Sequence, residues 1–122
     1  MKTRFTLFTM LALVLIGSVR GVFAEEVSHA KAVLVTGASS GIGLRIAETL
    51  SRNGFYVYAG ARNAEDLKML DAMDNVSAVR LDVTVDKDIE AAVDFVRKQG
   101  RGLWGIVNNA GVLRYSPLLS GP

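Results

Sequence analysis

The sequence predicts an α/β fold in which a doubly wound parallel sheet carries helices on both faces. Short apolar runs alternate with segments of helical periodicity from about residue 31 onward, a pattern typical of parallel strands joined by right-handed crossovers. A glycine-rich turn lies between the first apolar run and the first helical segment. The chain has 122 residues, 50% of them hydrophobic, which suits one small domain with a packed core.

Four strands are expected, in the sheet order 3-2-1-4, which is the N-terminal half of a doubly wound sheet. The first is a continuous apolar run with β-branched members, as in a strand buried on both faces. Trp104, in the fourth, is expected to pack in the core rather than against a ligand. The expected strands span residues 32–35, 56–59, 76–81 and 103–107.

Three helices are expected between these strands. The apolar residues of the first recur every four positions: Ile42, Ile46 and Leu50, with Ala47 beside them. Asn53-Gly54 is expected to end it. Asn63 is expected to cap the second helix through Asp66, with Leu67 and Leu70 facing inward. The third helix, residues 86–98, is amphipathic, with its apolar residues on one side: Ile89, Ala92, Val93 and Val96.

Residues 1–24 have the three-part layout of a secretory signal peptide. Lys2 and Arg4 precede an apolar run at residues 5–19, which is shorter than the roughly 20 residues of a membrane-spanning helix, and a polar connector follows at residues 25–30. Two alternatives stay open: a signal anchor that attaches the protein to a membrane through the apolar run, and a misassigned start codon. The protein is expected to be exported or membrane-associated in the first two cases and cytoplasmic in the third.

Charge and cysteine content exclude several classes of function. Lys2, Arg4 and Arg20 are three of the 14 basic residues, so 11 remain beyond the signal segment against 12 acidic ones. These charges are dispersed and form no basic patch, so no nucleic-acid partner is expected. The chain has no cysteine, which excludes disulfides and thiolate metal sites. No metal site is predicted.

The turn at residues 36–43 reads Thr-Gly-Ala-Ser-Ser-Gly-Ile-Gly and opens the first helix. Phosphate groups bind at helix N-termini, where unpaired N–H groups and the positive end of the helix dipole converge. Gly37 would permit the sharp turn, Gly41 the approach of a pyrophosphate, and Gly43 close packing of helix and strand. The turn residues expected to bind a dinucleotide are Gly37, Ser39, Ser40, Gly41, Ile42 and Gly43.

Two further motifs stand at the ends of later strands: Leu81-Asp82-Val83-Thr84 and Asn108-Asn109-Ala110-Gly111. The turn alone departs from the ordinary G-x-G-x-x-G spacing, and its alternative explanation is a tight strand–helix connection. Together, however, the three motifs resemble the short-chain dehydrogenase/reductase family over residues 31–113. The resemblance implies a Rossmann-type fold and a partial NAD(P)-binding domain at residues 31–122.

The resemblance also implies roles for residues of the later motifs. Asp82 would hydrogen-bond the adenine amino group beside the Val83 backbone; the alternative is that Asp82 caps the following helix. Asn109 and Ala110, with Gly111 after them, would border the adenosine ribose. Asn108 would brace neighbouring strands, because a buried Asn often satisfies backbone groups.

The end of the second strand bears on which nicotinamide cofactor fits. An NAD-specific site places a carboxylate there for the ribose 2′-hydroxyl, but Ala61 stands at that position and Arg62 follows. A guanidinium pairs with a 2′-phosphate, so NADP(H) is favoured over NAD(H). The alternative is that Arg62 is a solvated surface arginine. Ser40 stands where many NADP-preferring relatives place a second basic residue.

The family's chemistry is hydride transfer between NADP(H) and an alcohol or carbonyl substrate, and it needs a Ser and a Tyr-x-x-x-Lys pair. Tyr56, Tyr58 and Tyr115 each lack a Lys four residues on, and the sequence ends at Pro122. No catalytic residue is therefore named, and the chain is expected to be a fragment of low stability. A homo-oligomer is expected only for a full-length protein. A non-catalytic dinucleotide-binding module and an inactive truncated product are the alternatives. Residues 102–105 look like those of the retinol and hydroxysteroid dehydrogenase branch.

Overall fold

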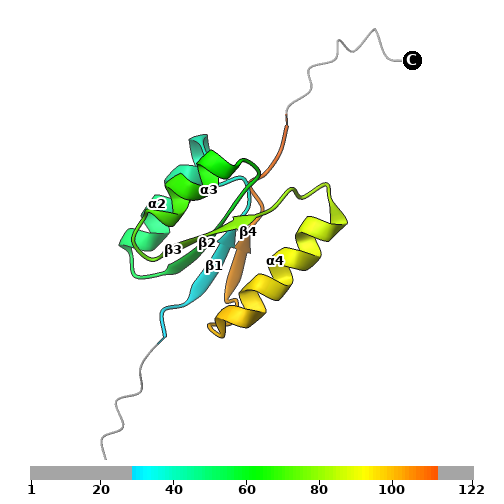
Figure 1. The fold of residues 1–122 in the computed structure, drawn as a ribbon. Coiled ribbons are helices and arrows are strands. Elements are labelled where there is room, and N and C mark those ends of the chain that lie inside the picture. The colour runs from blue at the N-terminus through cyan, green and yellow to red at the C-terminus, as the bar shows by residue number, and fades with distance from the viewer. Residues whose placement is uncertain (1–28, 113–122) are drawn as a thin grey trace, which may run out of the picture.

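A computed structural model describes residues 29–112, which form a four-stranded parallel sheet in the order β3-β2-β1-β4 (Figure 1). The predicted order is confirmed. The strands are β1 (Ala32–Val35), β2 (Tyr56–Ala61), β3 (Val76–Arg80) and β4 (Gly105–Val107). The connecting helices are α2 (Gly41–Arg52), α3 (Ala64–Asp71) and α4 (Asp86–Gln99). The fold is that of a Rossmann-type α/β domain.

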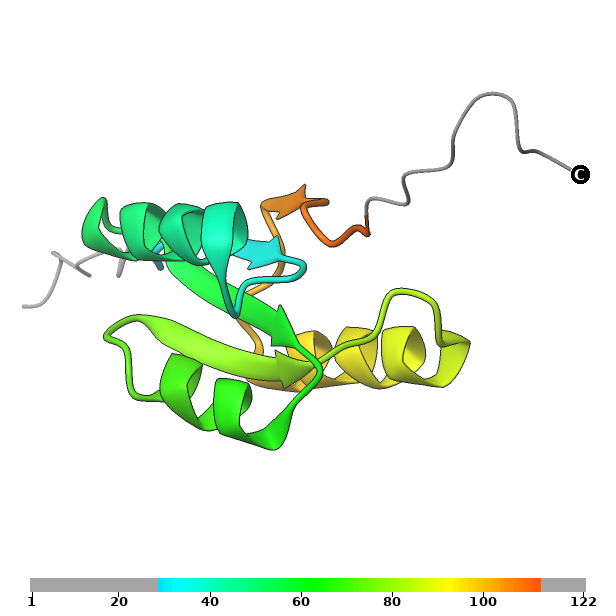
Figure 2. The ribbon, with the colours of Figure 1, turned by 90° about the horizontal axis from the view of Figure 1, so that it is seen from above.

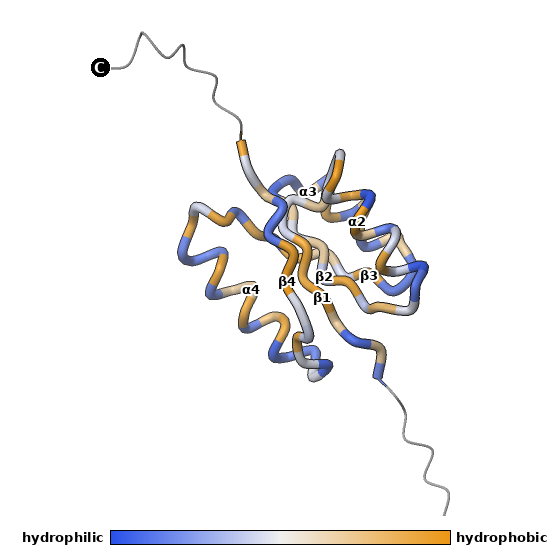
Figure 3. The backbone as a smooth tube through the Cα atoms, turned by 180° about the vertical axis from the view of Figure 1, so that it is seen from behind, coloured by the Kyte–Doolittle hydropathy of each residue, from blue (hydrophilic) through white to orange (hydrophobic). Residues whose placement is uncertain are grey.

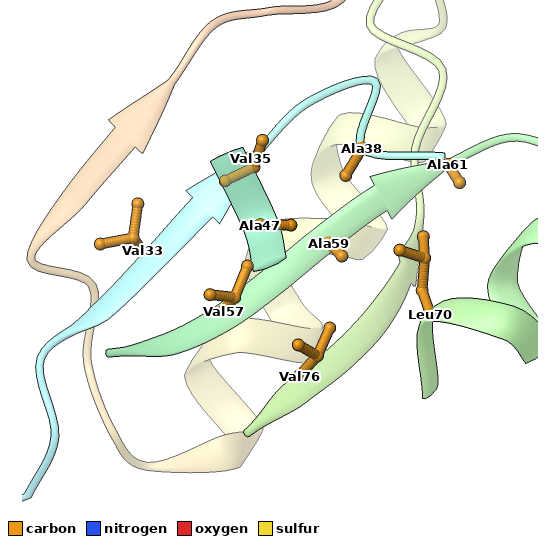
Figure 4. Packing of buried hydrophobic residues seen from close by; sticks show 9 residues of the cluster. All are labelled: Val33, Val35, Ala38, Ala47, Val57, Ala59, Ala61, Leu70 and Val76. Carbon is orange, nitrogen blue, oxygen red and sulfur yellow. The ribbon is translucent and has the colours of Figure 1, made fainter. Parts of the chain in front are cut away.

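The helices lie on both faces of the sheet, with α2 and α3 on one face and α4 on the other (Figure 2). Two apolar clusters fill these layers. The cluster under α2 and α3 is shown in Figure 4 and consists of Val33, Val35, Ala38, Ala47, Val57, Ala59, Ala61, Leu70 and Val76. The cluster under α4 consists of Ala32, Tyr58, Val79, Leu81, Ala92 and Val96. Figure 3 shows the apolar β1 and β4 between helices of mixed hydropathy.

The fourth strand is shorter than predicted, because it begins at Gly105 instead of residue 103. Gly100 and Gly102 have φ values of 69° and 72°, and such left-handed residues interrupt extended backbone. Trp104 N–H still donates to the Ala32 carbonyl at 2.8 Å. The Trp104 side chain is 63% exposed and lies against Phe55, with 5.9 Å between ring centroids. The expected core position of Trp104 is therefore wrong.

The apolar face of α2 is as predicted except at its first residue. On α2, Ala47 is buried and Ile46 and Leu50 pack against the core, whereas Ile42 is 75% exposed. Glycine at position 43 occupies the inward place in that first turn, so the apolar row begins one turn later than the spacing indicated. Asn53 is the C-cap of α2, as expected.

The ends of α3 and α4 differ in detail from expectation. Asn63 is the N-cap of α3, but its side chain makes no capping hydrogen bond; its carbonyl accepts the Leu67 N–H at 3.0 Å. Leu70 is fully buried, as predicted. On α4, Ala92 and Val96 are buried, while the other two apolar residues, Ile89 and Val93, are 40% and 44% exposed.

The expected signal segment and Tyr115 lie outside the described residues. Within residues 29–112, no helix combines the length and the apolar character needed to cross a bilayer. The described chain enters the sheet at β1 and leaves it after β4, at the opposite ends of these neighbouring strands (Figure 1).

Candidate functional site

The carboxyl ends of the four strands enclose a pocket of about 310 Å³. This edge is where open α/β sheets bind ligands. The pocket brings together nine of the predicted residues: Gly37, Ser39, Ser40, Arg62, Asp82, Val83, Asn109, Ala110 and Gly111. Gly41 and Ile42 lie at the adjoining start of α2, and Gly43 is buried one residue further on.

The glycine turn has the backbone geometry that an anion site requires. Gly37 and Gly41 have φ values of 63° and 54°, a region that L side chains rarely adopt. The Leu44 N–H donates to the Ser40 carbonyl at 3.3 Å, so the helix N–H groups of Gly41, Ile42 and Gly43 precede this first helical hydrogen bond. A Cβ built on Gly41 meets no atom within 4 Å. The backbone here is therefore open to approach by a phosphate.

Gly43 is required by packing. A Cβ at this position would overlap the Gly37 carbonyl oxygen and the Asn109 side-chain amide. A Cβ on Gly37 would lie 3.0 Å from the Ala110 Cα. The expected close packing at Gly43 is present, and its partners are the turn itself and the end of β4.

Thr36, at the end of β1, joins the glycine turn to β4. Its side chain is almost fully buried, and its Oγ1 accepts the backbone N–H groups of Asn109 and Ala110 at 3.0 Å each. The same hydroxyl donates to the Val107 carbonyl at 3.3 Å. No role was predicted for Thr36 from the sequence. A threonine directly after a buried strand is the sequence signal that could have pointed to this role, because a buried hydroxyl needs hydrogen-bond partners. Here the partners come from the motif after β4.

Asn109, not Asn108, braces the strands. The Asn109 Nδ2 donates to the carbonyls of Thr36 and Gly37 at 3.1 and 3.0 Å. Asn108 is exposed and faces an apolar groove on the α4 side of the sheet. The bracing expected of Asn108 is thus made by its neighbour, because consecutive side chains of extended backbone point to opposite faces.

Asp82 is held in a tight turn after β3. Its Oδ1 accepts the Thr84 hydroxyl at 2.6 Å and the Thr84 N–H at 2.9 Å. These hydrogen bonds keep the pKa of Asp82 below its ordinary value, and the charges of Arg62 and Arg80 add to the shift. The N-cap of α4 is Val85, so the alternative in which Asp82 caps this helix is wrong. Asp82 is an anion facing the pocket at neutral pH.

Arg62 directly follows β2 and lines the pocket, while Ala61 before it is buried. Among the residues that line the pocket, the end of β2 contributes this arginine and no carboxylate. Arg80, for which no role was predicted from the sequence, pairs in register with Ala61. Its Nη1 donates to the Arg62 carbonyl at 3.1 Å. This position depends on the register of β2 with β3, which the sequence pattern does not fix, so the sequence offered no signal for Arg80.

A second, larger hollow of about 680 Å³ lies between α4 and the exposed face of β1 and β4. Its walls are mainly apolar and include Ile89, Val93, Leu103 and Ile106, all at least 40% exposed. Ile89 and Val93 of α4 line this hollow and are therefore exposed, although they belong to the predicted apolar face of the helix.

Comparison with known proteins agrees with this geometry. Residues 31–120 match the family described as short chain dehydrogenase. The chain is 39% identical over 90 residues to 3-amino-tetrahydro-pyrrolizinone reductase of Xenorhabdus hominickii, covering 72% of this chain and 31% of that protein. It is 41% identical over 92 residues to estradiol 17-beta-dehydrogenase 2 of Rattus norvegicus, covering 70% and 24%.

Among solved structures, the chain resembles L-sorbose reductase from Gluconobacter frateurii, determined with NADPH and L-sorbose. The TM-score is 0.69 at 30% identity, over 76% of this chain and 38% of that one. The chain thus spans less than two fifths of each of these three proteins. The match over residues 31–120, together with the three motifs at the strand ends, shows that the chain belongs to the short chain dehydrogenase family.

Proposed function

We propose that this chain supplies the cofactor-binding part of an NADP(H)-dependent oxidoreductase that acts on an alcohol or carbonyl substrate. The observation that carries the proposal is one pocket lined by the glycine turn, Arg62, Asp82 and residues 109–111. Family membership supports it, as does the NADPH bound by the similar L-sorbose reductase.

The pyrophosphate would bind at the start of α2. The N–H groups of Gly41 and Ile42 precede the first helical hydrogen bond, and the hydroxyls of Ser39 and Ser40 are available beside them, because the Ser40 side chain makes no capping bond. Backbone N–H groups and the helix dipole both favour a doubly charged group here.

The adenosine would lie across the ends of β2, β3 and β4. Asp82 has an acceptor oxygen for the adenine amino group, since the Thr84 contacts engage Oδ1. Ala110 and Gly111 form the low wall beside the ribose. The methyl group of Ala110 and the absence of a side chain on Gly111 suit close approach of a sugar ring.

The 2′-position of that ribose would face Arg62. A carboxylate at the end of β2 would repel a 2′-phosphate, whereas a guanidinium forms charge-assisted hydrogen bonds with it. The negative charge of Asp82 in the same pocket makes this cation more necessary. These features support NADP(H) over NAD(H).

When bound, the nicotinamide supplies the position that accepts or donates hydride. Residues 29–112 bind and orient the cofactor, and we assign them no proton transfer. Tyr56 is engaged with the Ser77 hydroxyl, and Tyr58 is fully buried under α4. We therefore propose that the family's Ser, Tyr and Lys are contributed by parts of the protein outside the described residues.

The substrate class is proposed to be a lipophilic alcohol or ketone. The support is the identity with estradiol 17-beta-dehydrogenase 2 and the Gly102-Leu103-Trp104-Gly105 segment before β4.

We also propose that residues 1–24 direct export or membrane attachment, through the apolar run at residues 5–19.

The experiment is a calorimetric titration of the full chain with NADPH, NADH, 2′,5′-ADP and 5′-AMP, in the wild type and in Arg62→Met. We expect NADPH to bind more tightly than NADH, and Arg62→Met to weaken NADPH binding about tenfold or more. NADH binding should stay within about twofold of wild type. Arg52→Met, which removes an exposed arginine from the last turn of α2, controls for net charge.

A chain that binds neither NADPH nor NADH would overturn the proposal. Tighter binding of NADH than of NADPH would overturn the NADP(H) preference. A longer gene product, where one exists, should oxidise NADPH in the presence of lipophilic ketones. Tight NADPH binding by that product without turnover across a broad panel would instead indicate a non-catalytic dinucleotide-binding module.

A further inference from the structure

Arg80 lies beside the pocket, between the end of β2 and the start of α4. It is the last residue of β3 and pairs in register with Ala61 at the end of β2. Its Nη1 donates to the backbone carbonyl of Arg62 at 3.1 Å, and its Nε lies 3.7 Å from Asp88 Oδ2. One guanidinium thus contacts the turn after β2 and the first turn of α4 at the same time.

Asp88 extends these contacts to the turn after β3. The Oδ2 that faces Arg80 also accepts the backbone N–H of Asp82 at 3.0 Å. The Asp88 side chain is only 20% exposed, whereas that of Arg80 is 65% exposed. A continuous series of contacts therefore runs from the Arg62 main chain through Arg80 and Asp88 to the Asp82 main chain.

The carboxylate of Asp82 lies near the two guanidinium groups of Arg62 and Arg80. The carboxylate of Asp82 faces the pocket, and the positive charges of Arg62 and Arg80 both lower its pKa. Arg62 is exposed, and a free arginine side chain loses considerable conformational entropy when it is fixed on a ligand. Ordering the main chain of the turn that carries Arg62 costs entropy as well, and holding the Arg62 backbone in advance reduces that main-chain cost.

We propose that Arg80 is a positioning residue of the nucleotide site, which fixes the turn after β2 so that Arg62 presents its guanidinium to the 2′-phosphate of the cofactor. The inference rests on the proposed NADP(H) preference and deepens it. Arg80 acts through the carbonyl of Arg62 and through Asp88, and it is not assigned a contact with the nucleotide. A guanidinium suits this role because its planar fork donates in two directions at once.

The test compares 2′,5′-ADP with 5′-AMP, which differ only in the 2′-phosphate, by calorimetric titration of the full chain. Arg80→Met removes both contacts while keeping a long side chain. Arg80→Lys retains a cation that can reach one partner but not bridge both. Asp88→Asn keeps an oxygen for the Asp82 N–H and removes the charge that holds Arg80. Arg97→Met, which breaks an exposed ion pair with Asp94 at the far end of α4, is the control for charge.

We expect Arg80→Met to reduce the preference for 2′,5′-ADP over 5′-AMP by about three- to tenfold, with 5′-AMP affinity changed by less than about twofold. Asp88→Asn should reduce the preference in the same direction, Arg80→Lys should restore part of it, and Arg97→Met should leave it unchanged. Thermal melts check folding, and a loss of preference with an unchanged melting temperature supports a positioning role.

The result that would overturn the inference alone is a preference that Arg62→Met abolishes and that both Arg80→Met and Asp88→Asn retain. Equal loss of affinity for both nucleotides in Arg80→Met would overturn it as well, because the role would then be structural. A wild-type chain that does not distinguish 2′,5′-ADP from 5′-AMP would instead overturn the proposed cofactor preference, and this inference with it.

Discussion

Asn109 donates two hydrogen bonds to Thr36, one from its backbone and one from its side chain. The Asn109 backbone N–H donates to Thr36 Oγ1 at 3.0 Å, and the Asn109 side-chain amide donates to the Thr36 carbonyl at 3.1 Å. These contacts join residues 73 positions apart in the chain and tie the end of β4 to the start of the glycine turn. Because Gly37 and residues 109–111 line the proposed nucleotide site, its shape depends on this pair.

Thr36→Val should destabilise the protein by about 1–3 kcal/mol. The substitution preserves shape and leaves the backbone N–H groups of Asn109 and Ala110 without their acceptor, which costs the desolvation of buried donors. Urea unfolding of the full chain measures the change. Thr36→Ser keeps the hydroxyl and should lose less than about half as much. Equal stability of the Val and Ser variants would contradict the role given to this hydroxyl.

Gly43→Ala should destabilise the chain by about 1–3 kcal/mol and weaken dinucleotide binding, because the added methyl group overlaps the Gly37 carbonyl and the Asn109 amide. Displacing those two groups would distort the glycine turn. Gly105→Ala is a matched control, since a Cβ there meets nothing within 4 Å, and it should leave both properties unchanged. The measurements are urea unfolding and NADPH titration. Wild-type binding by Gly43→Ala would show that the turn tolerates the displacement.

The arrangement of the sheet could be predicted from the sequence because strand–helix alternation leaves few topologies for parallel strands. The alternation of apolar and polar residues could not predict which residues of each helix and strand are buried. Ile42 follows the helical spacing and is nevertheless exposed, since Gly43 takes the inward position. Trp104 was expected in the core, but the left-handed Gly100 and Gly102 delay the start of the strand to Gly105 and leave Trp104 before it.

The composition of the site could be predicted because the carboxyl ends of parallel strands meet at one edge. The contacts within it could not be predicted. Only the geometry after β4 decides that Asn109, and not Asn108, reaches the glycine turn. The position of Arg80 beside Arg62 depends on the register of β2 with β3, and period-two patterns do not fix the register of strands buried on both faces.

Tyr58→Phe should stabilise the protein by about 1 kcal/mol. The Tyr58 hydroxyl is buried, and it has no hydrogen-bond partner within the described residues; a polar group in that state costs free energy that phenylalanine avoids. Urea unfolding at neutral pH measures the gain, and Tyr56→Phe, which removes a hydroxyl bonded to Ser77, should be destabilising by contrast. A destabilised Tyr58→Phe would mean that the hydroxyl has a partner in solution.

Ionisation of Tyr58 should lower the free energy of unfolding at alkaline pH. Burial, together with the nearby Tyr56, raises the pKa of Tyr58 above its ordinary value of about 10. Because the folded state holds this proton more tightly than the unfolded state, the contribution is complete below pH 10 and is lost as pH rises toward the folded pKa. The stability advantage of Tyr58→Phe should therefore widen above about pH 10. An advantage that is constant with pH would contradict the shift.

Asp82 predicts the opposite dependence, at acid pH. The hydroxyl and N–H of Thr84 lower its pKa, so its contribution to stability is present above the unfolded pKa of about 3.9 and is lost as pH falls through the folded value. Thr84→Val removes the hydroxyl and leaves the N–H, so the Asp82 pKa, followed by carboxyl NMR titration, should move up toward its ordinary value. The same variant should keep the preference for 2′,5′-ADP, because the carboxylate stays ionised at neutral pH and Arg62 is unchanged. An unshifted pKa would show that the backbone N–H of Thr84 alone holds the carboxylate.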